Sequence, residues 1–259
     1  MSGVMDLTAA LTLGEAEARA ACAALPPAER AHAAAHALRL GRPHLTLDWS
    51  GDPLLRTAAH LRLGDTGAAR QELRAQPDAA RPAVLNARAA RLDGSPDAAA
   101  LAAHAARLAR AEGDGNALIA AAILNAEQDL FRASPERPGV AADRAAHFAA
   151  LRSLAEGLKV AELTGQPADP HLLAVLAHAQ WPLNSRKAAA TAAKALDRSE
   201  PGSPARVLAL LALNRPEEAH AQAQRGSLAA AWSEPFAGLV SAARPPATAP
   251  GTDGTAADG

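Results

Sequence analysis

The chain has 259 residues, of which 49% are hydrophobic and 2% aromatic, and its formal net charge at pH 7 is -1. A net charge near zero excludes a global field that would attract nucleic acid or an anionic membrane. The single cysteine, Cys22, excludes an internal disulfide framework. We expect a cytoplasmic protein, because the sequence shows neither a signal peptide nor an apolar run that would span a bilayer.

The first 52 residues predict an N-terminal helix pair and an irregular loop. Helical patterns cover about 15–25 and 27–40, and a pair of prolines separates them. Residues 41–52 lack a helical pattern, so we expect an irregular loop there. Whether 1–52 is a repeat or a cap stays open at this point.

Residues 53–243 predict an array of antiparallel helix pairs, because apolar residues recur at helical spacing and strand signals are sparse. The predicted pairs cover about 53–76, 82–112, 117–164, 169–199 and 203–225, and a capping helix follows at about 227–243. Asn116 is a plausible N-cap for the third pair. Residues 244–259 have no apolar periodicity and are predicted to form a disordered tail.

A turn motif recurs between Ala-rich helical segments. It turns on Gly64, Gly94, Asn184 and Asn214, and each copy is predicted to end one helix and to open another. Gly64 and Gly94 are 30 residues apart, and so are Asn184 and Asn214. A helix–turn–helix unit at such a period indicates a stacked array in which each pair packs on its neighbours.

On these residues the chain resembles the tetratricopeptide-repeat (TPR) family over about 53–112 and 169–226. That family repeats a helix pair of about 34 residues, with small residues in the turn and early in the second helix. The matching positions are Gly64, Ala69 and Leu73; Gly94, Ala99 and Ala103; Asn184, Ala189, Ala193, Leu196 and Pro201; and Asn214, Ala219 and Ala223. The family's bulky first-helix aromatic residues are absent, and the pair at 117–164 is too long for the repeat. The resemblance implies an all-α fold, an α-solenoid whose concave face holds a protein or peptide segment.

Arginines gather in the first clear repeats. We expect Arg62, Arg88 and Arg91 to be exposed and to donate charge-assisted hydrogen bonds to carboxylates of a partner. The leading hypothesis is therefore a non-enzymatic protein–protein interaction module. The alternative is a nucleic-acid-associated helical protein that uses the same arginines, and the plainest interpretation is a solvated helix face.

A second candidate stripe lies on the helix predicted after 169. His171 and His178 are seven residues apart, and Trp181 follows one turn later, so the stripe either packs or lines a binding groove. Glu127 and Asp129 cannot share one helix face and are not predicted to act as an acid–base pair. Phosphate-loop motifs are absent from the sequence, and we expect no cofactor.

Two further hypotheses stay open. His32 and His36 are four residues apart and are weak candidates for a metal site, and Cys22 would be a nucleophile if one of them lay against it. A metal- or cysteine-dependent enzyme is thus the third hypothesis. The fourth is a structural subunit that self-associates through exposed Trp232 and Phe236.

Overall fold

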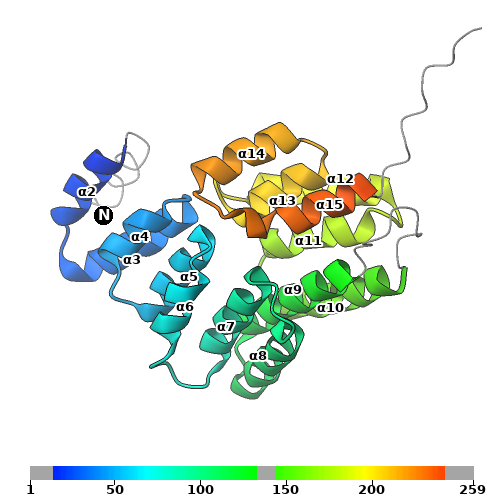
Figure 1. The fold of residues 1–259 in the computed structure, drawn as a ribbon, viewed down its shortest axis with the longest axis horizontal. Helices are drawn as coiled ribbons and strands as arrows, with labels where there is room; N and C mark the ends of the chain where they lie inside the picture. Colours follow the sequence, from blue (N-terminus) through cyan, green and yellow to red (C-terminus); the bar gives the residue numbers. More distant parts are fainter. Residues whose placement is uncertain (1–13, 133–143, 243–259) are drawn as a thin grey trace, which may run out of the picture.

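The computed structural model describes residues 14–132 and 144–242, which form helices and connecting turns, with no strand among them (Figure 1). The predicted all-α class is confirmed, and the predicted tail at 244–259 lies outside the described residues. The first half contains α2 (Glu15–Ala23), α3 (Pro27–Arg39), α4 (Pro43–Trp49), α5 (Pro53–Leu63), α6 (Thr66–Leu73), α7 (Ala80–Leu92) and α8 (Ala98–Glu112). The second half contains α9 (Gly115–Arg132), α10 (Arg144–Leu163), α11 (Pro170–Gln180), α12 (Ser185–Arg198), α13 (Pro204–Ala212), α14 (Pro216–Arg225), the 3₁₀ turn η1 (Ala230–Trp232) and α15 (Glu234–Ala242).

From α3 to α14, helices that follow one another along the chain pack against one another, whereas α2 packs on α4 and α15 on α13; together they trace a curved path (Figure 1). The largest apolar core lies where α9, α10, α11 and α13 meet, with Phe236 of α15 fully buried in it. Within the described ranges, no helix is both long and apolar enough to cross a membrane.

The irregular loop predicted at 41–52 was wrong for most of its length, because Pro43–Trp49 is helix α4. Pro43 stands in the first turn of α4, where its fixed φ favours a helix and its missing N–H costs nothing. Leu45 is fully buried against residues of α2 and α3, and the hydroxyl of Thr46 donates to the carbonyl oxygen of Ala34 at 3.1 Å. Burial by tertiary contacts thus stabilises a helix too short to be seen as a periodic pattern.

The recurring turns each end one helix and open another at all four positions, as predicted. Gly64, Gly94 and Asn214 adopt left-handed conformations, with φ of 79°, 65° and 57°. Asn184 is extended instead, and its side-chain oxygen accepts from the backbone N–H of Lys187 at 3.0 Å as the N-cap of α12. The predicted N-cap Asn116 was also wrong, since the carboxylate of Asp114 caps α9 by accepting from Ala117 N at 3.0 Å.

The single capping helix predicted at 227–243 was wrong, because this stretch bends at η1 before α15 and returns to the first half of the chain. The backbone N–H of Ala229 donates to Arg62 O at 2.8 Å, and the indole N–H of Trp232 donates to Leu61 O at 2.8 Å. We call residues 228–242 the closing segment. Trp232 and Phe236 are buried here, so the self-association hypothesis loses the exposed aromatic residues on which it depended.

Three glycines lie in contact where the end of α3 approaches the turns that flank α13 and α14. Gly41 follows α3, Gly202 lies between α12 and α13, and Gly226 follows α14. A Cβ atom on Gly226 would lie 2.0 Å from the carbonyl oxygen of Gly202, and one on Gly41 would lie 3.0 Å from the Cα of Gly226. Backbone segments approach this closely only where no side chain intervenes.

We expect Gly226→Ala to lower the free energy of unfolding by about 1–3 kcal/mol, because the added methyl group would overlap backbone atoms that cannot rotate away. Urea denaturation followed by circular dichroism measures this change. Gly238→Ala is the matched control, since a Cβ there has nothing within 4 Å and Gly238 lies inside α15. Equal stability of Gly226→Ala and the wild type would contradict the close packing.

Candidate functional site

A groove runs along the inner helices of the array. It comprises three neighbouring hollows with volumes of 490, 780 and 360 Å³. Ala120 of α9 lines all three, so the hollows adjoin one another. The lining comes chiefly from α5, α7, α9 and the start of α11, which are the first helices of successive pairs. We call this feature the central groove and its 490 Å³ part the central cavity.

A buried carboxylate lies behind the central cavity. Glu127 of α9 is 0% exposed and accepts a hydrogen bond from Arg88 Nη1. Arg91 Nε lies 2.8 Å from Glu127 Oε2, and His171 Nε2 lies 3.1 Å from Oε1. Burial by itself would raise the pKa of Glu127, but the positive charges of Arg88 and Arg91 and the His171 hydrogen bond hold it well below its ordinary value. The carboxylate therefore joins α7, α9 and α11.

Aromatic rings enclose this charge cluster. The Arg88 guanidinium lies 4.9 Å from the centre of the Trp232 ring, and that of Arg91 lies 4.7 Å from the centre of the Phe131 ring. Arg91 also donates to the carbonyl oxygen of Ala231 in the closing segment. The His171 and Trp232 rings meet edge to face, with centroids 6.1 Å apart. Stacking on aromatic faces is favourable for a guanidinium, so the closing segment contributes to holding both arginines in place.

The structure corrects the prediction that Arg88 and Arg91 are exposed. They are 9% and 6% exposed, because their guanidinium groups turn inward to Glu127 and the aromatic rings. The inward direction follows from their position on α7, whose face toward α9 also carries Val84. Arg88 still contributes to the lining of the central cavity, whereas Arg91 lines a separate hollow beside Phe131.

Arg62 lies in the central cavity and has no carboxylate partner among the described residues. Its Nη1 donates to the carbonyl oxygen of Leu38 at 2.6 Å, and the rest of the guanidinium has no hydrogen-bond partner within the described ranges. Burial lowers the pKa of Arg62 to about 10, so the group stays protonated at neutral pH. A largely buried cation without a counter-ion is a group that an anion would stabilise.

The stripe of His171, His178 and Trp181 is divided between two environments. His171 lines the central cavity, whereas His178 is buried in the core, donates from Nε2 to Leu208 O at 3.0 Å and packs against Phe236. Trp181 follows the end of α11 and does not line the central groove. Helical spacing brings such residues to one side of a helix, but α13 and α15 cover the part that carries His178.

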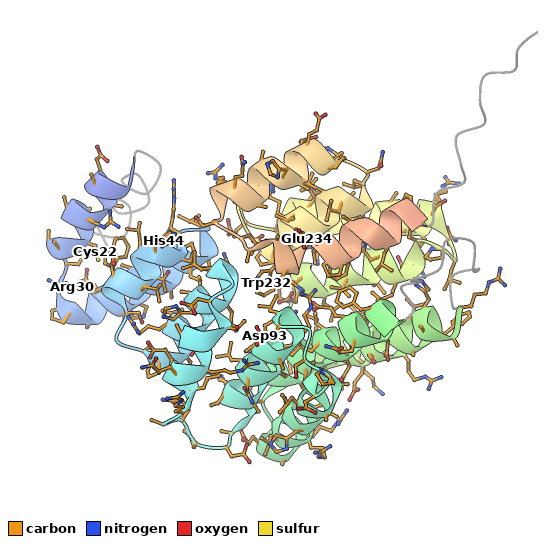
Figure 2. The ribbon with its side chains drawn as sticks, in the orientation of Figure 1. Cys22, Arg30, His44, Asp93, Trp232 and Glu234 are labelled. Atoms are coloured by element: carbon orange, nitrogen blue, oxygen red, sulfur yellow. The ribbon has the colours of Figure 1, made fainter. Side chains whose placement is uncertain are left out.

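The N-terminal candidates lie away from the central groove. Cys22 is 1% exposed in an apolar cluster with Ala33 and Leu45, and burial raises the pKa of its thiol (Figure 2). A thiol held protonated is a poor nucleophile. The ring of His32 bonds to Ala28 O and that of His36 to Arg39, and no group of three or more metal-binding side chains was found in the part of the chain that the structure describes.

No family model, curated protein or solved structure matches this chain. The resemblance to the tetratricopeptide-repeat family therefore stays a prediction, and the site is interpreted from its own geometry.

The two residues on which the site most depends, Glu127 and Trp232, were not among the predicted contacts. A signal for Glu127 was present, because it lies on the apolar face of α9 between Ile123 and Leu130. An acidic residue on an apolar helix face indicates a buried cationic partner. Trp232 carried no such signal, since its contact with Leu61 joins residues 171 positions apart.

We expect Glu127→Gln to lower the free energy of unfolding by about 3–5 kcal/mol, because it leaves two buried arginines without their counter-ion. Guanidinium-induced unfolding followed by circular dichroism measures the loss. Glu162→Gln, an exposed position on α10, is the matched control and should stay within about 0.5 kcal/mol of the wild type. Similar stability of the two variants would show that the buried ion pairs contribute little.

His178 makes the stability of the fold depend on pH. Burial lowers the pKa of His178 from 6.5 to about 4, so the unfolded chain binds a proton in this range and the folded chain does not. The contribution of His178 to the free energy of unfolding is therefore largest above pH 6.5, and it decreases as the pH falls toward 4. We expect the free energy of unfolding to lose about 2 kcal/mol between pH 7 and pH 5 through this group.

Urea unfolding at the two pH values measures that loss. His178→Leu should remove it, whereas His44→Leu, at an exposed position on α4, should keep it. The same pH dependence in both variants would mean that another group is responsible.

Proposed function

We propose that this chain is a non-enzymatic interaction module that holds a segment of a protein partner in the central groove. The observation that carries the proposal is that three adjoining hollows lie along the first helices of successive pairs. A groove of this kind accommodates an extended or helical segment, whose alternate side chains enter its hollows. The sequential packing of the helices supports a TPR-like α-solenoid, in which the central groove is the concave face.

The lining favours a segment that carries both apolar and acidic side chains. Val84, Ala120 and Ile123 supply apolar walls, and Arg62 and Arg198 supply positive charge. Arg198 is exposed and has no hydrogen bond or ion pair with any described residue. Arginine pairs with a carboxylate through two parallel hydrogen bonds, which favours an acidic partner.

The alternative, a nucleic-acid-associated protein, gains no support from Arg70 and Arg81 of the first repeats. Arg70 pairs with Asp93 at 2.6 Å, and Arg81 pairs with Asp114 at 2.7 Å. A carboxylate beside each guanidinium removes the excess positive charge that a phosphate backbone requires. The proposal also keeps the cytoplasmic location and the absence of a cofactor as expectations.

The proposal is tested by selecting binders from a random dodecapeptide library against the purified full chain. We expect enriched peptides to carry acidic residues next to apolar ones and to bind saturably in fluorescence polarisation. Ala120→Glu and Arg198→Glu should each weaken binding by about 10-fold or more, because they place negative charge in the groove.

Arg107→Glu is the matched control, since Arg107 is exposed on α8 and does not line the groove. Equal binding by the groove variants and the control would place the peptides on another surface and reject the proposal. Enrichment of no peptide would reject it as well.

A further inference from the structure

The central cavity has the size and the lining of a small-molecule site. Its 490 Å³ lies within the range of about 300–1,000 Å³ that is typical of ligand pockets. Leu61, Val84, Ile123 and Trp232 form apolar walls around it. A few polar groups among apolar walls are the arrangement that fixes the orientation of a bound organic molecule.

Arg62 is the polar group best placed to bind such a molecule. Its main chain is held by the hydrogen bond from Ala229, and its side chain by the hydrogen bond to Leu38 O. The remaining guanidinium N–H groups have no partner within the described residues and belong to a side chain that lines the cavity. A guanidinium fixed in this way binds a planar anion at low entropic cost, because little freedom is lost on binding.

The charges around the cavity favour a single negative charge on the ligand. Arg88 already pairs with Glu127, and Arg39, Arg62 and Arg198 have no carboxylate partner among the residues that the structure describes. Asp169 and Glu200 line the same cavity, and their negative charges offset two of these three positive charges. The excess of about one positive charge suits a carboxylate, whereas phosphate, which is partly a dianion at pH 7, would meet more repulsion from the two acids.

We propose that the central cavity binds a compact organic monocarboxylate, whose carboxylate pairs with Arg62 and whose apolar body lies against Ile123 and Trp232. This inference concerns a free small molecule and does not rest on the binding of a protein partner. Because the cavity is part of the central groove, a bound acid and a partner segment would compete for the space near Arg62.

The test is a titration of the purified full chain with hexanoate, with hexanamide, acetate and inorganic phosphate as comparison ligands. Isothermal calorimetry measures affinity, and tryptophan fluorescence reports the site in a Trp49→Phe, Trp181→Phe background in which Trp232 is the remaining indole. We expect hexanoate to bind saturably and to change the Trp232 emission. Hexanamide lacks the charge, acetate lacks the apolar body, and phosphate lacks that body and carries excess charge, so each should bind at least about 10-fold more weakly.

Arg62→Met should weaken hexanoate binding by about 10- to 100-fold, because it removes a charge-assisted hydrogen-bonding group. Arg107→Met, on the exposed face of α8, is the matched control and should bind like the wild type. Circular dichroism checks that each variant is folded. If Arg62→Met is not folded, Ala58→Leu provides the second test, since it fills the cavity from α5 and should also weaken binding.

Equal affinity for hexanamide and hexanoate would overturn the inference, because the charge would then play no part. Unchanged binding by a folded Arg62→Met, or by Ala58→Leu where Arg62→Met is not folded, would overturn it too, as would the absence of any binding. None of these titrations contains a peptide. The carboxylate site can therefore be rejected without rejecting the binding of a protein partner, and the peptide selection can fail without rejecting the carboxylate site.

Discussion

The arrangement of the inner helices depends on one buried carboxylate. Glu127 binds Arg88 and Arg91 of α7 and His171 of α11, and its own helix α9 lies between them. Removing these charges from water costs several kcal/mol for each ion, and only close pairing offsets that cost. The pairing constrains how α7, α9 and α11 are rotated about their axes, since a small rotation would leave a charge buried and unpaired. The same rotation sets which side chains line the central groove.

The closing segment completes this arrangement from the far end of the chain. Trp232 lies over Arg88, and its indole N–H satisfies the carbonyl oxygen of Leu61 near the end of α5. A stack of Ala-rich helices buries little apolar area per residue. A large aromatic side chain therefore supplies a larger share of the buried apolar area here than in an ordinary core. The segment thereby gives the central cavity one of its walls and secures the position of Arg62, which the proposed carboxylate site requires.

The two proposals for the groove follow from the contrast between Arg88 and Arg62. Both line the central cavity, but Glu127 pairs with Arg88, whereas the one partner of the Arg62 guanidinium within the described residues is a carbonyl oxygen. A paired arginine stabilises the fold, and an arginine without a counter-ion is available to an incoming anion. An acidic side chain of a partner and a free organic acid present the same group to Arg62, which is why the two experiments use different ligands.

The sequence by itself determined the all-α class, the position of most helices and the four recurring turns between helices, because helix propensity, apolar spacing and the turn preference of glycine and asparagine are local properties. It also brought Arg62 and Arg88 forward in one candidate patch and His171 in a separate stripe, and all three line the central cavity. The tertiary structure alone decided that Arg88 and Arg91 turn inward to Glu127, that residues 43–49 are helical, and that Trp232 closes the cavity against α5. These features depend on contacts between residues far apart in the chain, and the free energy of burying a charge or an indole is set by the neighbours that folding supplies.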